Sequence, residues 1–228
     1  MNHGPLIFLG TFVGMCLTWS AFVLGPVLQM GRQEVYVNAT TGERLPSPKP
    51  GLAEQGRQVY RSQGCQYCHT QQVHGTGLAQ GTNFFGYSGA DMAQGWGVRP
   101  TVARDYIFDR PTMLGLQRVG QDLANIGARQ ANAVWHYQHL YNPQTVSKGS
   151  VMPAYPFLFE KRKIGPTPSA DALLLAPGEV EVGYEIVPKP EAVALVAYLL
   201  SLEARDVYYE APLPLARAEA VADDAPKE

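Results

Sequence analysis

One short stretch, Cys65-Gln66-Tyr67-Cys68-His69, constrains this chain more than any other. It has the C-x-x-C-H form that attaches a c-type haem. Two thiols two residues apart can both reach the haem vinyl groups and form thioethers, and the adjacent imidazole then lies under the porphyrin, where it can bind iron. Because a protein with haem c most often moves electrons, the stretch predicts an electron-transfer protein in which Cys65 and Cys68 hold the haem and His69 binds its iron.

Two other uses of a cysteine pair fit the sequence less well. A zinc site needs about four Cys or His ligands, usually with a second pair at finger spacing. The one remaining cysteine, Cys16, lies far away in an apolar run. A thioredoxin-like redox pair sits at the strand-to-helix turn of a βαβ unit, whereas this pair follows a short helical stretch and directly precedes His69. Since the motif occurs once, we predict one covalently bound haem c.

Composition narrows the possible partners. The net charge is −2 and the isoelectric point is about 6.2. No basic patch with interleaved aromatic residues is present, so we expect no nucleic-acid partner. The chain has 18 prolines and 23 glycines, which predicts long loops. Its length suits one membrane anchor plus one globular domain.

The N-terminal part predicts a membrane anchor. No charged residue occurs from Gly4 to Gly31, and the apolar core runs from Pro5 to Leu28. A helix needs about 20 residues to cross a bilayer. A cleaved signal peptide fits less well, because no Lys or Arg precedes the run, the run is too long, and no A-x-A site follows. Gly10 and Gly14 form a G-x-x-x-G pair, which allows another helix to approach closely in the lipid bilayer or occurs simply because Gly is common in membrane helices.

The haem determines the expected orientation, since the loop charges say little about it. C-type haem is attached outside the bacterial cytoplasm. We therefore expect a single-pass protein of the bacterial inner membrane, with its short N-terminus inside and its haem domain in the periplasm or otherwise extracytoplasmic.

The rest of the chain divides by composition. We predict an anchor over 1–31, a proline-rich linker over 32–51, a cytochrome domain over 52–210 and a disordered tail over 211–228. Within the domain we expect a long wrapping loop over 73–97 and three helices. The first helix begins near Leu52, the second spans Gln130–Tyr141 and the third spans Pro190–Ala204. The β-prone run Val180–Val187 fits either a hairpin or a loop.

Two of these helices give the chain a resemblance to class I cytochromes c. The opening helix carries Gly56-x-x-x-Tyr60 before the haem motif, and the closing helix carries Leu195-Val-Ala-Tyr198-Leu199. The resemblance implies that these two helices cross at close range, with Gly56 letting them touch. The expected fold class is all-α: a single N-terminal transmembrane helix plus a class I cytochrome c-like domain with long loops.

Three further motifs resemble the mono-haem subunit of cbb3-type cytochrome c oxidases, the C-family haem-copper oxidases, where it is subunit II. They are Tyr67-Cys68-His69-x-Gln71, Trp135-His136-x-x-His139-Leu-Tyr141-Asn142-Pro143 and Met152-Pro153-Ala154-Tyr155-Pro156. The likeness covers the anchor and most of residues 52–160 and is weak in 74–97 and 165–188. It implies a respiratory electron-transfer subunit that takes electrons from another c-type cytochrome subunit or a soluble cytochrome c. It would pass them to the b haem of a catalytic subunit with b haems and copper, which reduces dioxygen.

One departure from that family concerns the proximal ligand. The family usually has Gly-Pro-Asp-Leu where this chain has Gly120-Gln121-Asp122-Leu123. In class I cytochromes the carbonyl of that proline accepts a hydrogen bond from the ligating His. Gln121 keeps a carbonyl, so we expect the bond to survive in a less rigid loop, with a modest shift in haem potential.

The sixth iron ligand has several candidates after the motif: Met92, Met113, Met152, His74, His136 and His139. His74 is too close in sequence to reach the opposite haem face, and the two later histidines fit packing or surface roles on a helix. Met152 lies in an extended loop before the closing helix, and Met152-Pro153 matches the family motif. We therefore predict Met152 as the ligand. Arg118 and Tyr155 are the favoured partners of the haem propionates, ahead of Arg99, Arg104 and Trp96.

His/Met ligation leaves no open iron site, and thioether sulfur favours ferrous iron, so outer-sphere electron transfer is expected. Alternatives are the cytochrome subunit of a nitric oxide reductase, an independent anchored carrier, and a haem-based gas sensor, which needs an open or labile sixth position. A cytochrome peroxidase usually needs a second haem motif, which this sequence lacks.

Overall fold

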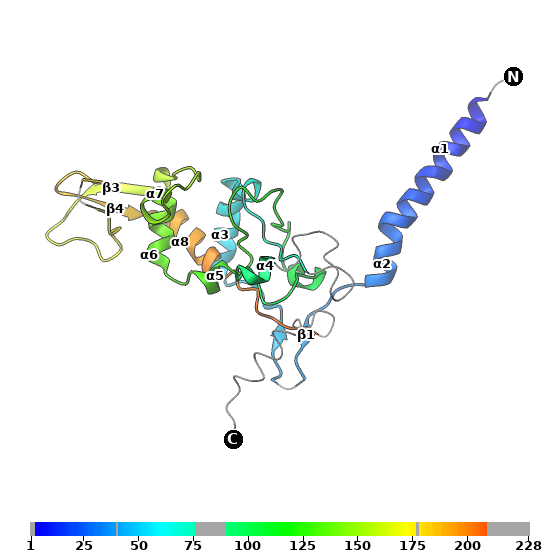
Figure 1. Ribbon diagram of the computed structural model, residues 1–228, viewed down its shortest axis with the longest axis horizontal. Helices are drawn as coiled ribbons and strands as arrows, with labels where there is room; N and C mark the ends of the chain where they lie inside the picture. The colour runs from blue at the N-terminus through cyan, green and yellow to red at the C-terminus, as the bar shows by residue number, and fades with distance from the viewer. Residues whose placement is uncertain (1–2, 40, 76–89, 177, 209–228) are drawn as a thin grey trace. The chain divides into compact units, whose positions relative to one another are not determined.

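The computed structural model describes residues 3–39, 41–75, 90–176 and 178–208. The described part is mainly helical, as predicted for an all-α chain, with two short strand pairs in addition (Figure 1). The chain forms two compact units, residues 1–46 with 103–107, and residues 47–102 with 108–228. Much of the predicted loop 73–97 and all of the predicted tail 211–228 lie outside the described residues, and the predicted domain boundaries stay predictions.

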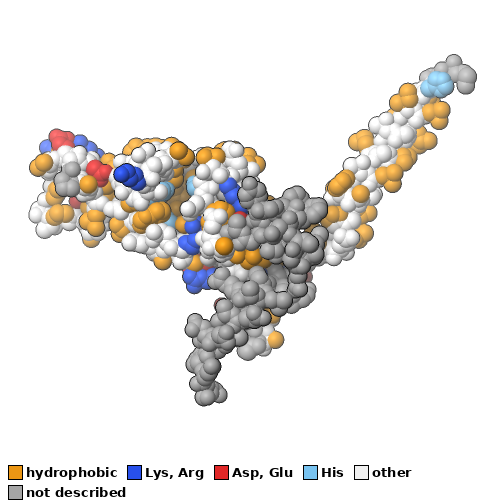
Figure 2. All heavy atoms as spheres, in the orientation of Figure 1, with side chains coloured by type: hydrophobic (Ala, Val, Ile, Leu, Met, Phe, Trp, Pro, Cys, Tyr) orange, Lys and Arg blue, Asp and Glu red, His pale blue; other side chains and the backbone are white. Residues whose placement is uncertain are grey.

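The first unit begins with one long apolar helix. Helix α1 (Gly4–Trp19), the π-helical turn η1 (Ser20–Leu24) and α2 (Gly25–Met30) follow without interruption. Together they give 27 residues, with a mean hydropathy of 1.9 over an 18-residue window, and about 40 Å of helix, which is enough to cross a bilayer. The π turn precedes Pro26, which has no N–H to continue the regular bonding. Figure 2 shows hydrophobic side chains along the visible face of this helix.

The remainder of the first unit contains little regular structure. Strand β1 (Tyr36–Val37) pairs antiparallel with β2 (Arg44–Leu45) inside the segment predicted to be a linker. The 3-10 turn η3 (Ala103–Tyr106) also belongs to this unit. Arg104 on this turn donates a hydrogen bond to the carbonyl of Glu34.

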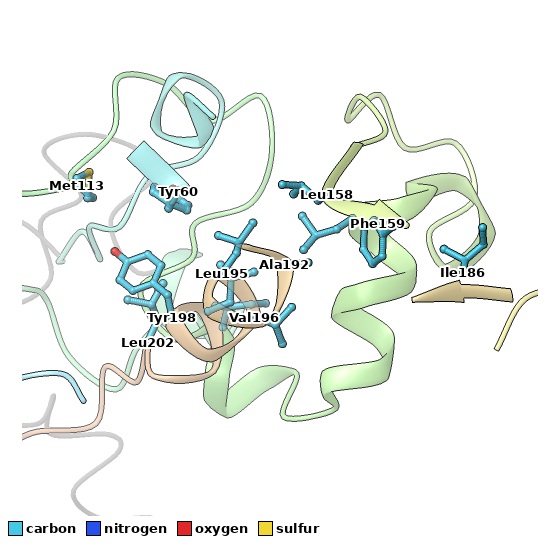
Figure 3. Close-up of a cluster of buried hydrophobic side chains, with 13 residues drawn as sticks. Tyr60, Met113, Leu158, Phe159, Ile186, Ala192, Leu195, Val196, Tyr198 and Leu202 are labelled. Atoms are coloured by element: carbon cyan, nitrogen blue, oxygen red, sulfur yellow. The ribbon is translucent and has the colours of Figure 1, made fainter. Parts of the chain in front are cut away.

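The core of the second unit is the crossing of α3 (Gly51–Ser62) with α8 (Pro190–Leu200), as the sequence predicted. A Cβ on Gly56 would lie only 1.8 Å from the Ala194 carbonyl oxygen and 2.8 Å from the Tyr198 Cβ. Only glycine therefore permits this approach. The rings of Tyr60 and Tyr198 meet edge to face, with centroids 5.4 Å apart. Figure 3 shows both tyrosines in one buried cluster with Leu195, Val196 and Met113.

Five further short helical elements of this unit lie between α3 and residue 147 in the sequence. They are η2 (Cys65–Tyr67), α4 (Ala90–Ala93), α5 (Ile126–Arg129), α6 (Ala133–Tyr141) and α7 (Pro143–Val146). Helix α6 begins three residues later than predicted, because the Asn132 side chain accepts from the Val134 N–H and caps the helix there. It ends before Asn142-Pro143, as expected from the proline.

Helix α8 ends at Leu200, four residues earlier than predicted. Gly127 packs against the Leu200 carbonyl, where an added Cβ would lie 2.1 Å from the oxygen. The Gly127 N–H then donates to the Leu202 carbonyl at 2.9 Å, and the Ala204 N–H donates to Asn125 Oδ1 at 3.0 Å. Residues 201–204 thus pair with the segment before and within α5 instead of continuing the helix.

The undecided β-prone run is one strand of a hairpin. After the turn η4 (Pro156–Leu158), β3 (Phe159–Lys163) pairs antiparallel with β4 (Tyr184–Pro188), with Phe159 opposite Pro188. Leu158 and Phe159 pack into the buried cluster of Figure 3. The hairpin is therefore attached to the same core as the α3–α8 crossing.

Candidate functional site

The C-x-x-C-H motif forms one tight turn directly after α3. Gly64 adopts a left-handed conformation with φ of 72°, which ends the helix and starts η2. The N–H groups of Cys68 and His69 both donate to the Cys65 carbonyl, at 3.2 and 3.0 Å. Both thiols are free, with Cys65 partly buried and Cys68 exposed. The turn therefore presents two thiols and one imidazole within a single loop of backbone.

The imidazole of His69 is held from one side. Its Nδ1 lies 2.8 Å from the Gln121 carbonyl oxygen, and because a carbonyl only accepts, Nδ1 carries the proton and donates. The predicted hydrogen bond is thus present although Gln replaces Pro. Nε2 is left unprotonated and able to bind a metal. Burial lowers the pKa of His69, which favours this neutral form.

Glycines allow the chain to approach His69 closely. A Cβ on Gly120 would lie 2.2 Å from the His69 Cε1 atom, and one on Gly115 would lie 2.2 Å from the His69 carbonyl oxygen. Gly115 also has a φ of 84°, where a side chain is strained. The ring therefore lies in a close backbone cradle, and its orientation is determined by the protein itself.

A buried carboxylate fixes the segments on either side of His69. Asp122 is completely buried and accepts from the Thr70 hydroxyl at 2.5 Å, and from the N–H groups of Gln72 and Ala124 at 2.8 Å each. These bonds join the residues after the motif to the loop that carries Gln121. The bonds thus hold Asp122, the residue that follows Gln121, and leave the torsions of Gln121 itself to other contacts.

Arg118, a predicted propionate partner, lies beside this carboxylate. Its Nη1 and Nη2 donate to the two oxygens of the buried Asp91, at 3.0 and 2.7 Å, and its Nε donates to Thr70 Oγ1 at 2.9 Å. The guanidinium also lies over the Trp96 ring, 4.7 Å from its centroid. The structure thus gives Arg118 a bidentate protein partner, and its contact with a propionate stays a prediction.

Tyr155, the other predicted propionate partner, lies near the motif. Its backbone N–H donates to the Leu140 carbonyl at 2.8 Å, which joins the segment that carries Met152 to α6. Burial raises the pKa of the Tyr155 phenol, and the nearby Cys65 and Cys68 add to the shift. Met152 is partly buried and packs against the hydrophobic core. Its N–H donates to Ser150 Oγ at 3.2 Å.

His139 on α6 lies in the same region as the motif. Its ring stacks on Trp135 with centroids 4.6 Å apart. Burial, with smaller contributions from nearby His69 and His136, lowers the pKa of His139 to about 4. Its Nδ1 is buried and has no hydrogen-bond partner within the described residues. His139 was one of the candidate sixth ligands in the sequence, where a packing or surface role was favoured. Its place near His69 was not predicted, because its spacing from His136 contains no signal of it.

The other candidate ligands have different surroundings. Met113 is buried in the core cluster, close to Tyr60 in Figure 3. His136 is buried, with Nε2 2.7 Å from the Gln130 carbonyl oxygen. His74 Nδ1 lies 3.2 Å from Asp91 Oδ2, with the imidazole half exposed. Met92 lies on α4 and is partly buried.

These residues fit a haem c. The motif turn supplies two thiols for thioether bonds, and His69 supplies a neutral imidazole whose Nε2 is free to bind iron. Met152 supplies a thioether, and His139 supplies a buried nitrogen without a partner in the described part of the chain. Haem c uses this combination of thiols, imidazole and thioether.

Comparison with known proteins agrees with this chemistry. The family model described as cytochrome c oxidase, mono-heme subunit/FixO matches residues 12–186. The match includes most of the apolar helix, the C-x-x-C-H motif and the Met152 segment. A search of curated proteins gives no match to the chain.

Proposed function

The chain belongs to the family of mono-haem subunits of cbb3-type cytochrome c oxidases, and on this premise we propose how it works there. Family membership gives it a haem cofactor, a catalytic oxidase subunit as partner and a membrane anchor, Gly4–Met30. We propose that it relays electrons to the b haem of that catalytic subunit, where dioxygen is reduced, and receives them from another c-type cytochrome.

Cys65 and Cys68 would bind the haem covalently, with His69 and Met152 as the two iron ligands. When bound, this group supplies a reversible one-electron change at iron. The residues of the chain orient and tune it. The Gln121 carbonyl holds the proton on His69 Nδ1, so Nε2 would be free to bind the iron, and the Gly115–Gly120 cradle restricts the ring. Tyr155, and Arg118 where its ion pair allows, would contact the propionates.

One observation carries the proposal. The motif turn ends in a neutral His69 whose Nδ1 already donates to a backbone carbonyl. Iron-bound imidazoles use this arrangement, because it fixes the tautomer and raises the basicity of the ligating nitrogen. A zinc site would need further Cys or His ligands, and no cluster of three or more metal-ligating side chains occurs in the described residues.

A denaturing gel stained for haem tests covalent attachment. The full chain, expressed with c-type maturation machinery, should retain one haem, and Cys65→Ala with Cys68→Ala should retain none. Cys16→Ala is the control, because this exposed cysteine lies in the anchor, and its variant should stain as the natural chain does. A natural chain that carries no haem, or two, would contradict the proposal.

Extraction of membranes in mild detergent tests the partner. The chain should copurify with a subunit that contains b haem and copper. Gly10 and Gly14 leave open space on α1, with no atom within 4 Å of an added Cβ, so Gly14→Ile should weaken the association if this face contacts another helix. Extraction of the natural chain alone would instead favour an independent anchored carrier.

The haem domain is proposed to lie in the periplasm, because c-type haem is attached outside the bacterial cytoplasm. In spheroplasts, an impermeant amine reagent and added protease should reach residues beyond 47 while the membrane is intact. Protection of the haem domain until the membrane is lysed would reverse the orientation.

A further inference from the structure

One guanidinium holds the segment whose carbonyl bonds to His69. Arg129 Nη1 donates to the side-chain oxygen of Gln121 at 2.8 Å, and Arg129 Nη2 donates to the Asp122 backbone carbonyl at 2.6 Å. The carbonyl of Gln121 is at the same time the acceptor for His69 Nδ1. Arg129 therefore restrains residue 121 through its side chain and residue 122 through its backbone.

Arg129 is itself attached to the core of the second unit. It is the last residue of α5, and Gly127 on that helix packs directly against the end of α8. The Gly127 N–H donates to the Leu202 carbonyl at 2.9 Å. The aliphatic part of Arg129 packs on Gly95, where an added Cβ would lie 3.4 Å from the Arg129 Cδ. A continuous series of contacts thus runs from α8 through Arg129 to Gln121 and His69.

Residue 121 needs such a restraint. A proline would fix φ through its ring, but glutamine leaves this torsion free. Gln121 is exposed, so packing does not hold it. A small rotation of residue 121 would turn its carbonyl away from His69 Nδ1 and weaken that bond.

We propose that Arg129 is a positioning residue for the iron ligand, which fixes the Gln121 carbonyl and so sets the electron density on His69. The inference rests on the proposed role of His69 as iron ligand. A stronger Nδ1–H···O bond makes the imidazole a better donor and stabilises ferric iron. The Arg129–Gln121 pair therefore takes over in this chain the restraint that a proline ring would supply.

The first test is Arg129→Lys in the haem-loaded protein. Lysine keeps the positive charge but lacks the planar fork that reaches two acceptors. We expect a higher reduction potential and broader low-spin ferric EPR lines, with the haem still attached. Arg61→Lys, on the exposed surface of α3, is the matched control and should change neither measurement.

The second test is a double-mutant cycle at residue 121. Gln121→Ala keeps the carbonyl but removes the acceptor for Arg129, so the potential should rise in the same direction as in Arg129→Lys. Gln121→Pro should restore narrow lines, because the ring fixes φ. Within the described residues the Gln121 backbone N–H makes no hydrogen bond that proline would remove. In the Gln121→Pro background, Arg129→Lys should have no further effect on the potential.

The outcomes separate this inference from the proposed function. An unchanged reduction potential and EPR linewidth in Gln121→Ala would overturn the inference. An equal shift in potential from Arg129→Lys in the natural chain and in Gln121→Pro would also overturn it. Gln121 is a surface residue, so its alanine variant should fold even if an Arg129 variant does not. A natural chain without covalent haem would instead contradict the proposed function.

Discussion

The two ligand-bearing sides of the candidate site are held to different extents. On the His69 side (residues 65–75 and 114–129), backbone bonds join the two segments at four places: Gln71 to Leu114, Leu116 to Gln66, Gly120 to Cys68 and Leu123 to Thr70. On the Met152 side (residues 133–158), the backbone bond from the Tyr155 N–H to Leu140 joins the Met152 segment to α6, and the other bonds next to Met152 are local ones to Ser150 and Ser147. Val151, next to Met152, is 80% exposed.

This difference separates two kinds of ligand. The His69 side is assembled by buried hydrogen bonds within the polypeptide, so its geometry does not depend on the bond to iron. Packing against the core and a few bonds hold the Met152 side, so the sulfur of Met152, the proposed second ligand, should be easier to displace. Removing the imidazole or the buried carboxylate on the His69 side should therefore affect haem attachment and folding first, and removing Met152 should affect ligation and potential first.

The largest effect is expected from His69→Ala. Without the proximal imidazole the haem has no ligand adjacent to its two thioethers, so mature cytochrome should be lost almost completely. Haem staining of the membrane fraction measures the loss, with immunoblotting of the polypeptide as the control for expression. A haem level near that of the natural chain would show that the His69 side is not required for attachment.

Asp122→Ala tests the strength of the His69 side. The substitution leaves the Thr70 hydroxyl and two backbone N–H groups without their acceptor, which should cost about 3 kcal/mol of unfolding free energy. Denaturant unfolding of the loaded protein measures it. Ser150→Ala, which removes one bond on the Met152 side, is the matched comparison and should cost about 0.5–1 kcal/mol. Equal losses would remove the distinction between the two sides.

Met152→Ala should leave the haem attached but open the sixth position. Loss of the thioether should lower the reduction potential and allow carbon monoxide to bind the ferrous form. The natural oxidised protein should show the weak near-infrared sulfur-to-iron band, and the variant should lack it. Survival of that band would show that Met152 is not the ligand, and a natural chain that binds carbon monoxide readily would favour a gas sensor.

The sequence predicts the parts of this molecule that depend on a local pattern or on a family motif. The uncharged run predicts the long apolar helix, and the resemblance to class I cytochromes c predicts the close α3–α8 crossing at Gly56 and the bond from His69 to the Gln121 carbonyl. The structure contains each of these features.

The contacts that the sequence did not predict join distant side chains without a periodic signal. Asp91 pairs with Arg118 across 27 positions, and it comes from a Gly-rich stretch without helix or strand period. Arg129 reaches Gln121 only because the chain turns between them. Strand β3 carries four exposed charged residues, Glu160, Lys161, Arg162 and Lys163. These charged residues contain no signal of its pairing with β4.

A small effect is expected at His139, which lies on α6 near His69. Burial lowers the pKa of His139 to about 4 in the folded protein, against about 6.5 in an unfolded chain. Above pH 6.5 the ring is neutral in both states. As the pH falls from 6.5 to 4, the unfolded chain binds a proton that the folded protein does not, so stability is lost through this window. The loss should be about 1–2 kcal/mol, less than the full linkage value because the ring is partly exposed.

His139→Gln should remove this contribution. The variant's thermal midpoint should fall less between pH 6.5 and 4 than that of the natural chain, while His3→Gln, at the exposed start of the anchor, should leave the pH dependence unchanged. Parallel curves for the natural chain and His139→Gln would show that His139 does not titrate on unfolding. If the thermal midpoint of His139→Gln alone did not change between pH 6.5 and 4, the acid sensitivity of the Met152 side would arise from the His139 ring. This ring is stacked on Trp135 and lies close to His69.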